Sequence, residues 1–219
     1  MPSRPRVAAE PGDADMKLLY TPIRDYVHTV EAVIRYAGLE SCIEPVATKP
    51  FDPATPLAAI NPLGKVPTLL LDDGGYLAGG PVIYEYLDTL HRRRKLYPAR
   101  GRARFTTLRQ AWMADGLFDT FVLLIIESWL PPAQQRSDYI ARCWSKVIAI
   151  LDRMERDAPG YGRIDIAQFR GVGALQFLRL KMAQVGSAAV GLDPGYDVLA
   201  GRPALAQWFT RTERAPMFH

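Results

Sequence analysis

The pattern of apolar residues along this 219-residue chain changes once, near residue 95. Before that point, short strand-like runs alternate with short amphipathic segments, and after it the strand signals stop. The expected order between residues 17 and 92 is strand, helix, strand, helix, strand, strand, helix. A small α/β unit followed by long helices predicts two domains in one chain, α/β and then all-α.

The first part has four expected strands and three expected helices. We expect strands at 17–20, 43–46, 66–71 and 76–78, and helices at 26–37, from Asp52-Pro53 onward and at 81–92. Proline is tolerated in a first helical turn, which is why a helix is expected to begin at Asp52-Pro53. Asp73-Gly74-Gly75 between two strands predicts a hairpin turn.

The second part predicts four helices, at 103–129, 134–157, 164–185 and 203–214. The third of these is apolar on nearly every face, so we expect it at the centre of a helical bundle. The expected organisation is a disordered tail at 1–15, a first domain at 16–93, a linker at 94–102 and an all-helical domain at 103–219. Met16 directly precedes the first strand, which makes it an alternative start of translation.

Composition excludes several classes of protein. The net charge of +4 is small, and its densest cluster is the run from Arg92 to Lys95, so we expect no nucleic-acid partner. No apolar stretch approaches the roughly 20 residues of a membrane span, and we expect no membrane partner. Cys42 and Cys143 lack CxxC spacing, which predicts a reducing compartment, no disulfide framework and no bound metal.

Two segments carry a family resemblance: NPLGKVPTLLLDDG at 61–74 and PVIYEYLD at 81–88. Together with Ile164 to Ala167 at the start of the third long helix and Arg202-Pro203 before the last, they resemble the bacterial branch of the glutathione S-transferase family. The resemblance covers almost the whole chain after Met16. It implies a thioredoxin-like first domain, a helical second domain and glutathione as co-substrate.

The resemblance implies glutathione contacts at Lys65, Val66, Pro67, Gly79 and Gly80. Val66-Pro67 before a strand suits a cis-proline bend, which can expose the Val66 amide and carbonyl. In the family this backbone pairs with the cysteinyl residue of glutathione as a short extra strand. The simpler alternative is that Pro67 only starts the strand.

Gly79-Gly80 is a departure from the family pattern, which has Glu-Ser or Asp-Ser at this point. In the family the serine hydroxyl and the following helix N-terminus hold the γ-glutamyl carboxylate. Here the amides remain, while the hydroxyl and the acidic partner of the γ-glutamyl ammonium are missing. A lost hydrogen bond to a charged group is worth about 1.5–3 kcal/mol.

The catalytic position is the second departure. Related sequences carry Ser or Cys where this chain has Arg24, followed by Asp25. A guanidinium can stabilise a thiolate by charge, but Arg24 and Asp25 can equally form a surface ion pair of little energetic consequence. Tyr20, Thr21 and Tyr26 are the other candidates, with His28 in reserve.

Two features of the helical part complete the expected site and scaffold. In the family, residues at the positions of Phe105, Arg109, Trp112 and Met113 line the pocket for the electrophile, although aromatic residues at helical spacing are also typical of a core. Asp165 is expected to act in a capping box, with Gly162 as the N-cap.

Two functions of different classes follow. The first is a cytoplasmic, homodimeric transferase that conjugates glutathione to a small hydrophobic electrophile, or carries out a related thiol transfer. The alternative is a non-catalytic protein of the same fold that acts in ligand binding or protein–protein interaction. A disulfide oxidoreductase is disfavoured because the chain has no CxxC motif.

Overall fold

The computed structural model describes residues 15–22, 28–52, 54–185 and 196–219. The chain divides into two compact units, with the main boundary between Lys95 and Leu96. Unit 1 precedes this boundary and holds a mixed sheet with helices, whereas unit 2 follows it and is helical. The expected fold class, α/β followed by all-α, is confirmed.

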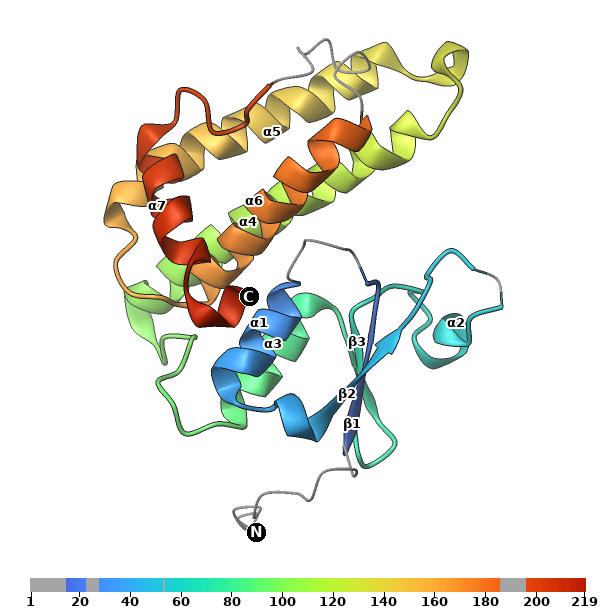
Figure 1. Ribbon diagram of the computed structural model, residues 1–219, viewed down its shortest axis with the longest axis vertical. Coiled ribbons are helices and arrows are strands. Elements are labelled where there is room, and N and C mark those ends of the chain that lie inside the picture. Colours follow the sequence, from blue (N-terminus) through green and yellow to red (C-terminus); the bar gives the residue numbers. More distant parts are fainter. Residues whose placement is uncertain (1–14, 23–27, 53, 186–195) are drawn as a thin grey trace. The chain divides into compact units, whose positions relative to one another are not determined.

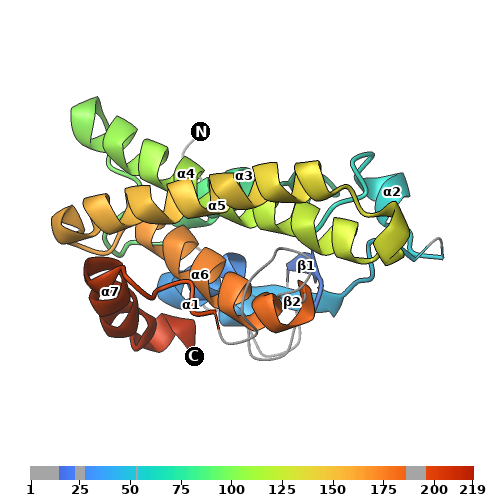
Figure 2. The same cartoon turned by 90° about the horizontal axis from the view of Figure 1, so that it is seen from above.

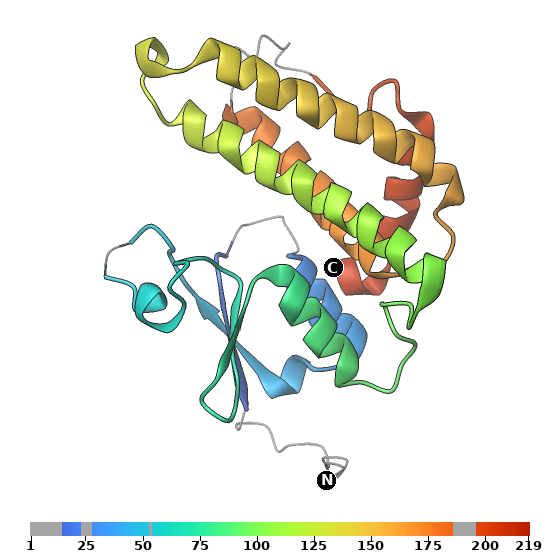
Figure 3. The same ribbon diagram turned by 180° about the vertical axis from the view of Figure 1, so that it is seen from behind.

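Unit 1 contains the seven elements in the order that the sequence predicts. They are β1 (Met16–Tyr20), α1 (Thr29–Ala37), β2 (Ile43–Ala47), α2 (Leu57–Ile60), β3 (Thr68–Leu70), β4 (Tyr76–Ala78) and α3 (Gly80–Thr89). The strands form one sheet in the order β2-β1-β3-β4, in which β1 and β2 are parallel and the other pairs are antiparallel. Helices α1 and α3 lie side by side on one face of the sheet, and α2 lies on the other side (Figures 1 and 3).

The core of unit 1 lies between the sheet and the helix pair. Leu18 of β1 and Leu69 of β3 are directly paired in the sheet, and both are buried. Ile83 and Leu87 of α3, one turn apart, are also fully buried. Side chains four residues apart share one face of a helix, so this face of α3 is fixed against the core and the orientation of the helix N-terminus is set.

The expected helix start at Asp52-Pro53 is wrong. Asp52 instead closes a turn, because its Oδ1 accepts a hydrogen bond of 2.9 Å from the Ala54 amide. Aspartate favours such turns by bonding the backbone two residues on. Helix α2 begins later, at Leu57 after Pro56, and Pro53 lies outside the described residues.

The described part of unit 2 contains four α-helices: α4 (Gly101–Ser128), α5 (Ser137–Asp157), α6 (Ile166–Val185) and α7 (Pro203–Glu213). Helix α4 packs against both α5 and α6, and α4 and α5 run side by side in the view from above (Figure 2). Every residue from 166 to 175 is buried, so the expected central position of α6 is confirmed. No helix in the described parts of the chain is long and apolar enough to cross a membrane.

The start of α6 differs from the expected capping box. Asp165 directly precedes the helix, and its Oδ1 accepts hydrogen bonds from the amides of Ala167, at 2.9 Å, and Gln168, at 3.4 Å. Asp165 is therefore itself the N-cap, and the assignment of Gly162 to that role is wrong. Its second oxygen accepts a hydrogen bond of 2.8 Å from the Thr107 hydroxyl, which joins α6 to α4.

The start of α7 is capped from another helix. Glu155 of α5 accepts hydrogen bonds from the amides of Ala204, at 3.1 Å, and Leu205, at 2.7 Å. A carboxylate at a helix N-terminus satisfies amides that have no partner inside the helix and interacts favourably with the helix dipole. Arg202, which precedes the helix, binds Asp152 of α5 through Nε at 2.9 Å. Helices α5 and α7 are thus joined by charge as well as by packing.

Candidate functional site

A cis peptide bond joins Val66 to Pro67, immediately before β3. The sheet register places this bond at one end of the sheet. Leu19 of β1 pairs with Thr68, and Thr68 pairs with Ala78 of β4. Antiparallel pairing continued past these residues brings the end of β1, the cis bond and the Gly79-Gly80 pair to the same edge.

Side-chain hydrogen bonds fix the turn before the cis bond. The Asn61 amide donates to the Lys65 carbonyl and to the Thr68 hydroxyl, both at 3.0 Å. The Thr68 hydroxyl donates to the same Lys65 carbonyl at 2.8 Å, and Asn61 Oδ1 accepts from the Leu63 amide at 3.1 Å. Asn61 and Thr68 are 1% and 0% exposed, so these bonds are shielded from competing water.

The sequence predicts no individual role in the site for Asn61 or Thr68. Both are polar residues beside a proline motif, and their separation by seven positions gives no helical or strand periodicity that could pair them. Only the folded turn brings them together. Lys65, by contrast, uses its backbone carbonyl here, and its side chain is exposed.

Val66 has unused backbone hydrogen-bonding groups. Within the described parts of the chain, neither its amide nor its carbonyl is paired with another protein group. Val66 is half-buried at the end of the sheet, just before β3, where its unpaired backbone groups can accept an added peptide strand.

The N-terminus of α3 lies next to the cis bond. The Gly79 amide donates a hydrogen bond of 3.2 Å to the Pro67 carbonyl, which links the two segments directly. Gly79 has a φ of +88°, a value that favours glycine. Pro81 has no N–H, so the unpaired amides of the first turn are those of Gly80 and Val82, again among the described residues. Such amides attract anions.

Tyr84 occupies the space above Gly80. A Cβ atom added at Gly80 would lie 2.4 Å from the Tyr84 hydroxyl oxygen and 2.7 Å from its Cζ. Tyr84 is four residues further along α3, and side chains of a helix point back toward the N-terminus. The phenol hydroxyl is therefore at the position that a side chain of residue 80 would take.

The four expected catalytic residues divide into two pairs. Arg24 and Tyr26 lie outside the described residues. Tyr20 ends β1 and is half-buried, and its carbonyl accepts a hydrogen bond of 2.7 Å from the Thr48 amide. The Thr21 hydroxyl donates to the Thr48 carbonyl at 3.2 Å. A threonine hydroxyl has one proton, so this bond uses the only donor that Thr21 could offer to a sulfur.

The expected pocket residues all lie on α4 in unit 2. Phe105 and Trp112 are 70% and 69% exposed, and their separation of seven residues places them on one stripe of the helix. Arg109 lies between them and donates a hydrogen bond of 3.1 Å to Asp157 of α5. Met113 is half-buried.

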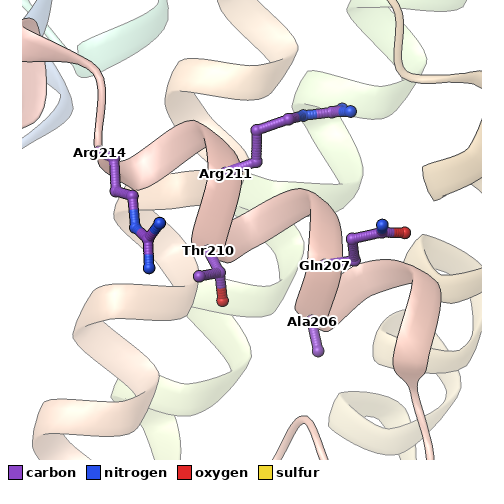
Figure 4. A pocket seen from close by; sticks show the side chains of 5 residues that line it. All are labelled: Ala206, Gln207, Thr210, Arg211 and Arg214. Carbon is purple, nitrogen blue, oxygen red and sulfur yellow. The ribbon is translucent and has the colours of Figure 1, made fainter.

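An open hollow of about 460 Å³ lies along α7 in unit 2. It is lined by Ala206, Gln207, Thr210, Arg211 and Arg214 (Figure 4). Helix α7 and its C-cap residue Arg214 supply the whole lining, and four of the five residues are exposed, so the hollow is a shallow surface feature rather than an enclosing site. It contains none of the residues expected to act in binding or catalysis.

Neither a metal-binding cluster nor a disulfide occurs among the described residues. They contain no group of three or more His, Cys, Asp or Glu side chains placed to hold a metal ion. Cys143 is buried on α5 and Cys42 is half-buried, and both are free thiols.

Comparison with known proteins agrees with this geometry. The family model described as "Glutathione S-transferase, N-terminal domain" matches residues 25–90. The uncharacterized GST-like protein YibF of Escherichia coli K12 is 26% identical over 140 residues, which cover 64% of this chain and 68% of YibF.

Two solved structures are similar over nearly the full length. A glutathione S-transferase from Methylobacillus flagellatus with GSH bound is 28% identical, with a TM-score of 0.81, over 93% of this chain and 96% of the other. A glutathione transferase family member from Pseudomonas fluorescens Pf-5 with bound glutathione is 27% identical, with a TM-score of 0.80 and the same coverage. The sequence motifs, the fold and these similarities together show that the chain belongs to the glutathione S-transferase family.

Proposed function

We propose that unit 1 binds glutathione and that the protein transfers the glutathione thiol to a small hydrophobic electrophile. The observation that carries this proposal is that two neighbouring segments of unit 1 have backbone groups without a hydrogen-bond partner among the described residues. Val66 offers an amide and a carbonyl at the cis bond, and the α3 N-terminus offers the amides of Gly80 and Val82. The hydrogen bond from Gly79 to Pro67 holds the two surfaces together.

The two surfaces match the two parts of glutathione that need them. The cysteinyl backbone of the tripeptide adds to Val66 as a short strand, and the γ-glutamyl carboxylate binds at the α3 N-terminus. Two related proteins were solved with glutathione bound, which supports the same ligand here. Lys65 contributes through its carbonyl, which holds the turn in place.

Conjugation then requires the thiol of glutathione as a thiolate. The sulfur forms a bond to the electrophilic carbon, the leaving group departs with its bonding electrons, and the thiol proton is released to solvent. Arg24, Tyr20 and Tyr26 remain the candidates that stabilise the sulfur charge. Thr21 is the weaker candidate because Thr48 already takes its proton.

The electrophile site is proposed on α4. Phe105 and Trp112 present large apolar surfaces on one stripe, and exposed aromatic side chains of this size mark binding surfaces for apolar ligands or partners. Arg109 lies between Phe105 and Trp112 on the helix and forms an ion pair with Asp157. A guanidinium group is therefore present beside this apolar surface. We propose Phe105, Trp112 and Met113 as the apolar contacts.

A second candidate is a glutathione-binding protein of this fold without turnover. It is favoured by the engagement of Thr21 with Thr48, which leaves the glutathione sulfur without that donor. It keeps the binding surfaces and gives up only the activation of sulfur. In this case the exposed stripe on α4 contacts another ligand or protein.

Calorimetric titration with glutathione, paired with a chlorodinitrobenzene assay, separates these outcomes. Binding with turnover above the uncatalysed rate supports the transferase. Binding without turnover supports the second candidate, and the absence of binding up to tens of millimolar overturns both. In the active case, Arg24→Ala and Tyr20→Phe identify the sulfur ligand by loss of kcat, and Thr21→Ala serves as the comparison expected to change it least.

We also propose that the protein works as a cytoplasmic homodimer. The support is the membership of the family together with two free cysteines, which suit a reducing compartment. A monomeric mass by light scattering at micromolar concentration would contradict the dimer.

A further inference from the structure

Arg109 and Arg153 share one carboxylate on the surface of unit 2. Arg109 Nη2 of α4 donates to Asp157 Oδ2 at 3.1 Å, and Arg153 Nε of α5 donates to both oxygens of Asp157, each at 3.1 Å. The carboxylate is the covered member of this cluster, because its side chain is 16% exposed and both arginine side chains are 43% exposed. With two cations around one anion, the exposed part of the cluster is positive.

Most N–H groups of the two guanidiniums are not used by this cluster. A guanidinium carries several N–H donors in a planar fork. Asp157 takes the Nε–H of Arg153 and one N–H of Arg109, and within the described ranges no other group accepts from either side chain. The terminal NH2 groups of Arg153 are therefore available to a second carboxylate, whose shape and charge match a guanidinium.

Arg109 also lies within the aromatic stripe of α4. Phe105 is four residues before it and Trp112 is three residues after it, and residues at these separations are neighbours on a helix surface. Both aromatic side chains are exposed. The same stretch of surface thus offers apolar faces for a ring and guanidinium groups for an anion.

We propose that Arg109 and Arg153 form an anion subsite, and that the electrophile is an aromatic compound that carries a carboxylate. This inference rests on the proposed function, because it names the substrate class of the site on α4. The ring contacts Phe105 or Trp112, and the carboxylate accepts hydrogen bonds from the guanidinium groups. Asp157 holds both guanidiniums in place.

The other titratable groups beside this cluster are compatible with an anion. Burial, followed by the charge of Asp157, raises the pKa of Tyr161, so its phenol stays neutral. The charge of Asp165 also acts on Tyr161, but Asp165 accepts hydrogen bonds through both oxygens at the α6 N-cap. It also has a cation of its own nearby, Arg163. The excess charge around the two arginines of the subsite therefore remains positive.

Two ligands that differ in charge test the subsite directly. 4-Nitrobenzoate and 4-nitrobenzamide have the same ring and nearly the same shape, but only the benzoate carries a carboxylate. We expect the wild-type protein to bind the benzoate about 5- to 10-fold more tightly at low ionic strength, which lies between the effects of an exposed ion pair and of a buried charged hydrogen bond. Calorimetric titration measures both affinities. Equal affinities, or no binding of the benzoate, would overturn the inference.

Single substitutions locate the anion. Arg109→Gln and Arg153→Gln each leave Asp157 paired with the other arginine, so the fold should be kept, as Tm would verify. Each should weaken the benzoate severalfold more than the amide. The matched control is Arg156→Gln, which removes the same charge from an exposed residue of α5 that has no ion pair within the part of the chain described. It should keep the wild-type preference. An equal loss of preference in all three variants would show a general charge effect and overturn the inference.

A double variant tests the ring contact. Phe105→Ala combined with Trp112→Ala removes the apolar surface and keeps both guanidinium groups, so it should weaken the benzoate and the amide to a similar degree. Unchanged affinity for both ligands would separate the aromatic stripe from the anion subsite and overturn the inference.

Turnover separates this inference from the proposed function. The paired electrophiles are 4-chloro-3,5-dinitrobenzoate and its amide. In both, the glutathione sulfur forms a bond to the carbon that carries chlorine, chloride leaves with the bonding electrons, and the thiol proton is released to solvent. The KM of the wild-type protein should be lower for the benzoate, and Arg109→Gln should reduce this difference. Equal KM values would overturn the inference and leave the proposed function standing. Absence of turnover with both would overturn the transferase, whereas the nitrobenzoate titration would still decide the anion subsite.

Discussion

The side-chain amide of Asn61 donates a hydrogen bond of 3.0 Å to the hydroxyl of Thr68, across the turn that contains the cis bond. Both residues are almost completely buried, and each also binds the carbonyl of Lys65. The segment that presents Val66 is therefore positioned by two polar side chains within the protein and does not depend on a ligand for its shape. This arrangement is the preorganised part of the candidate site.

Asn61→Ala should lower the free energy of unfolding by about 1–3 kcal/mol. The Lys65 carbonyl and the Thr68 hydroxyl would lose a hydrogen-bond donor, and the Leu63 amide would lose its acceptor. The substitution should also weaken glutathione binding, since the turn that carries Val66 loses two of its bonds. Chemical denaturation and calorimetry measure the two effects. Lys65→Ala is the control, because Lys65 contributes its carbonyl and its side chain is exposed. Its stability should stay within about 0.5 kcal/mol of wild type.

Asp165→Ala should destabilise the protein by about 1–3 kcal/mol through loss of the α6 N-cap and of the bond to Thr107. Asp165→Asn should cost much less, since asparagine caps a helix about as well as aspartate. Burial raises the pKa of Asp165, although hydrogen bonds from Thr107 and from the Gln168 and Ala167 amides oppose this effect.

The raised pKa of Asp165 has a consequence for the pH dependence. The folded protein holds the proton more strongly than the unfolded chain, so stability declines as the pH rises from the ordinary value of 3.8 through the raised one. The asparagine variant has no such group. The free energy of unfolding of Asp165→Asn, relative to that of wild type, should therefore increase as the pH rises through this range. Urea titrations at several pH values measure this difference. A difference that does not change with pH would contradict the raised pKa of Asp165.

Gly171→Ala should lower stability by about 1–3 kcal/mol through overpacking. A Cβ at Gly171 of α6 would lie 2.9 Å from Cη2 of Trp208, which is buried on α7. Gly116→Ala on α4 is the matched control, because there the nearest atom, Cδ1 of Ile150, is at an ordinary 3.9 Å. That change should stabilise the helix by about 0.5–1 kcal/mol. Thermal unfolding of both variants compares the two sites, and equal shifts would contradict the close packing.

His91 should make the protein less stable in mild acid. Its burial, together with the charge of Lys95, lowers its pKa below the ordinary 6.5, whereas Asp88 opposes this change. The unfolded chain therefore binds the proton first, and this contribution to stability is present above pH 6.5 and is lost as the pH falls below it. His91→Gln keeps an N–H that can donate to Asp88 and removes the titration. Its stability should change less between pH 7 and pH 5, measured by urea unfolding.

The sequence allowed most of the framework to be predicted. Strands and helices are local features with regular periods, so β4 was expected at its observed bounds, 76–78, and α7 within one residue of its end. Asp52 shows the limit of this reasoning, because an aspartate before proline suits both a helix start and a turn. Whether Asp52 starts a helix or closes a turn depends on the conformation of the chain around it.

The contacts of the candidate site were less accessible. The Val66-Pro67 bend was expected because a motif marks it, and the cis bond is present. The link from Gly79 to Pro67 and the pairing of Asn61 with Thr68 depend on chain reversal, which brings together residues with no periodic relation. Tyr84 falls within the helix expected at 81–92, and its spacing gives no sign that its hydroxyl covers Gly80.

The φ of +88° at Gly79 bears on how this site could have evolved. Any other residue there adopts a rarely populated backbone conformation at a cost of about 1–3 kcal/mol, so an acidic residue must return more than that through its ligand. A side chain at Gly80, in turn, requires the Tyr84 ring to move or to be replaced. Positions 80 and 84 are therefore coupled, and larger side chains in this glycine pair meet an obstacle at each of the two glycines.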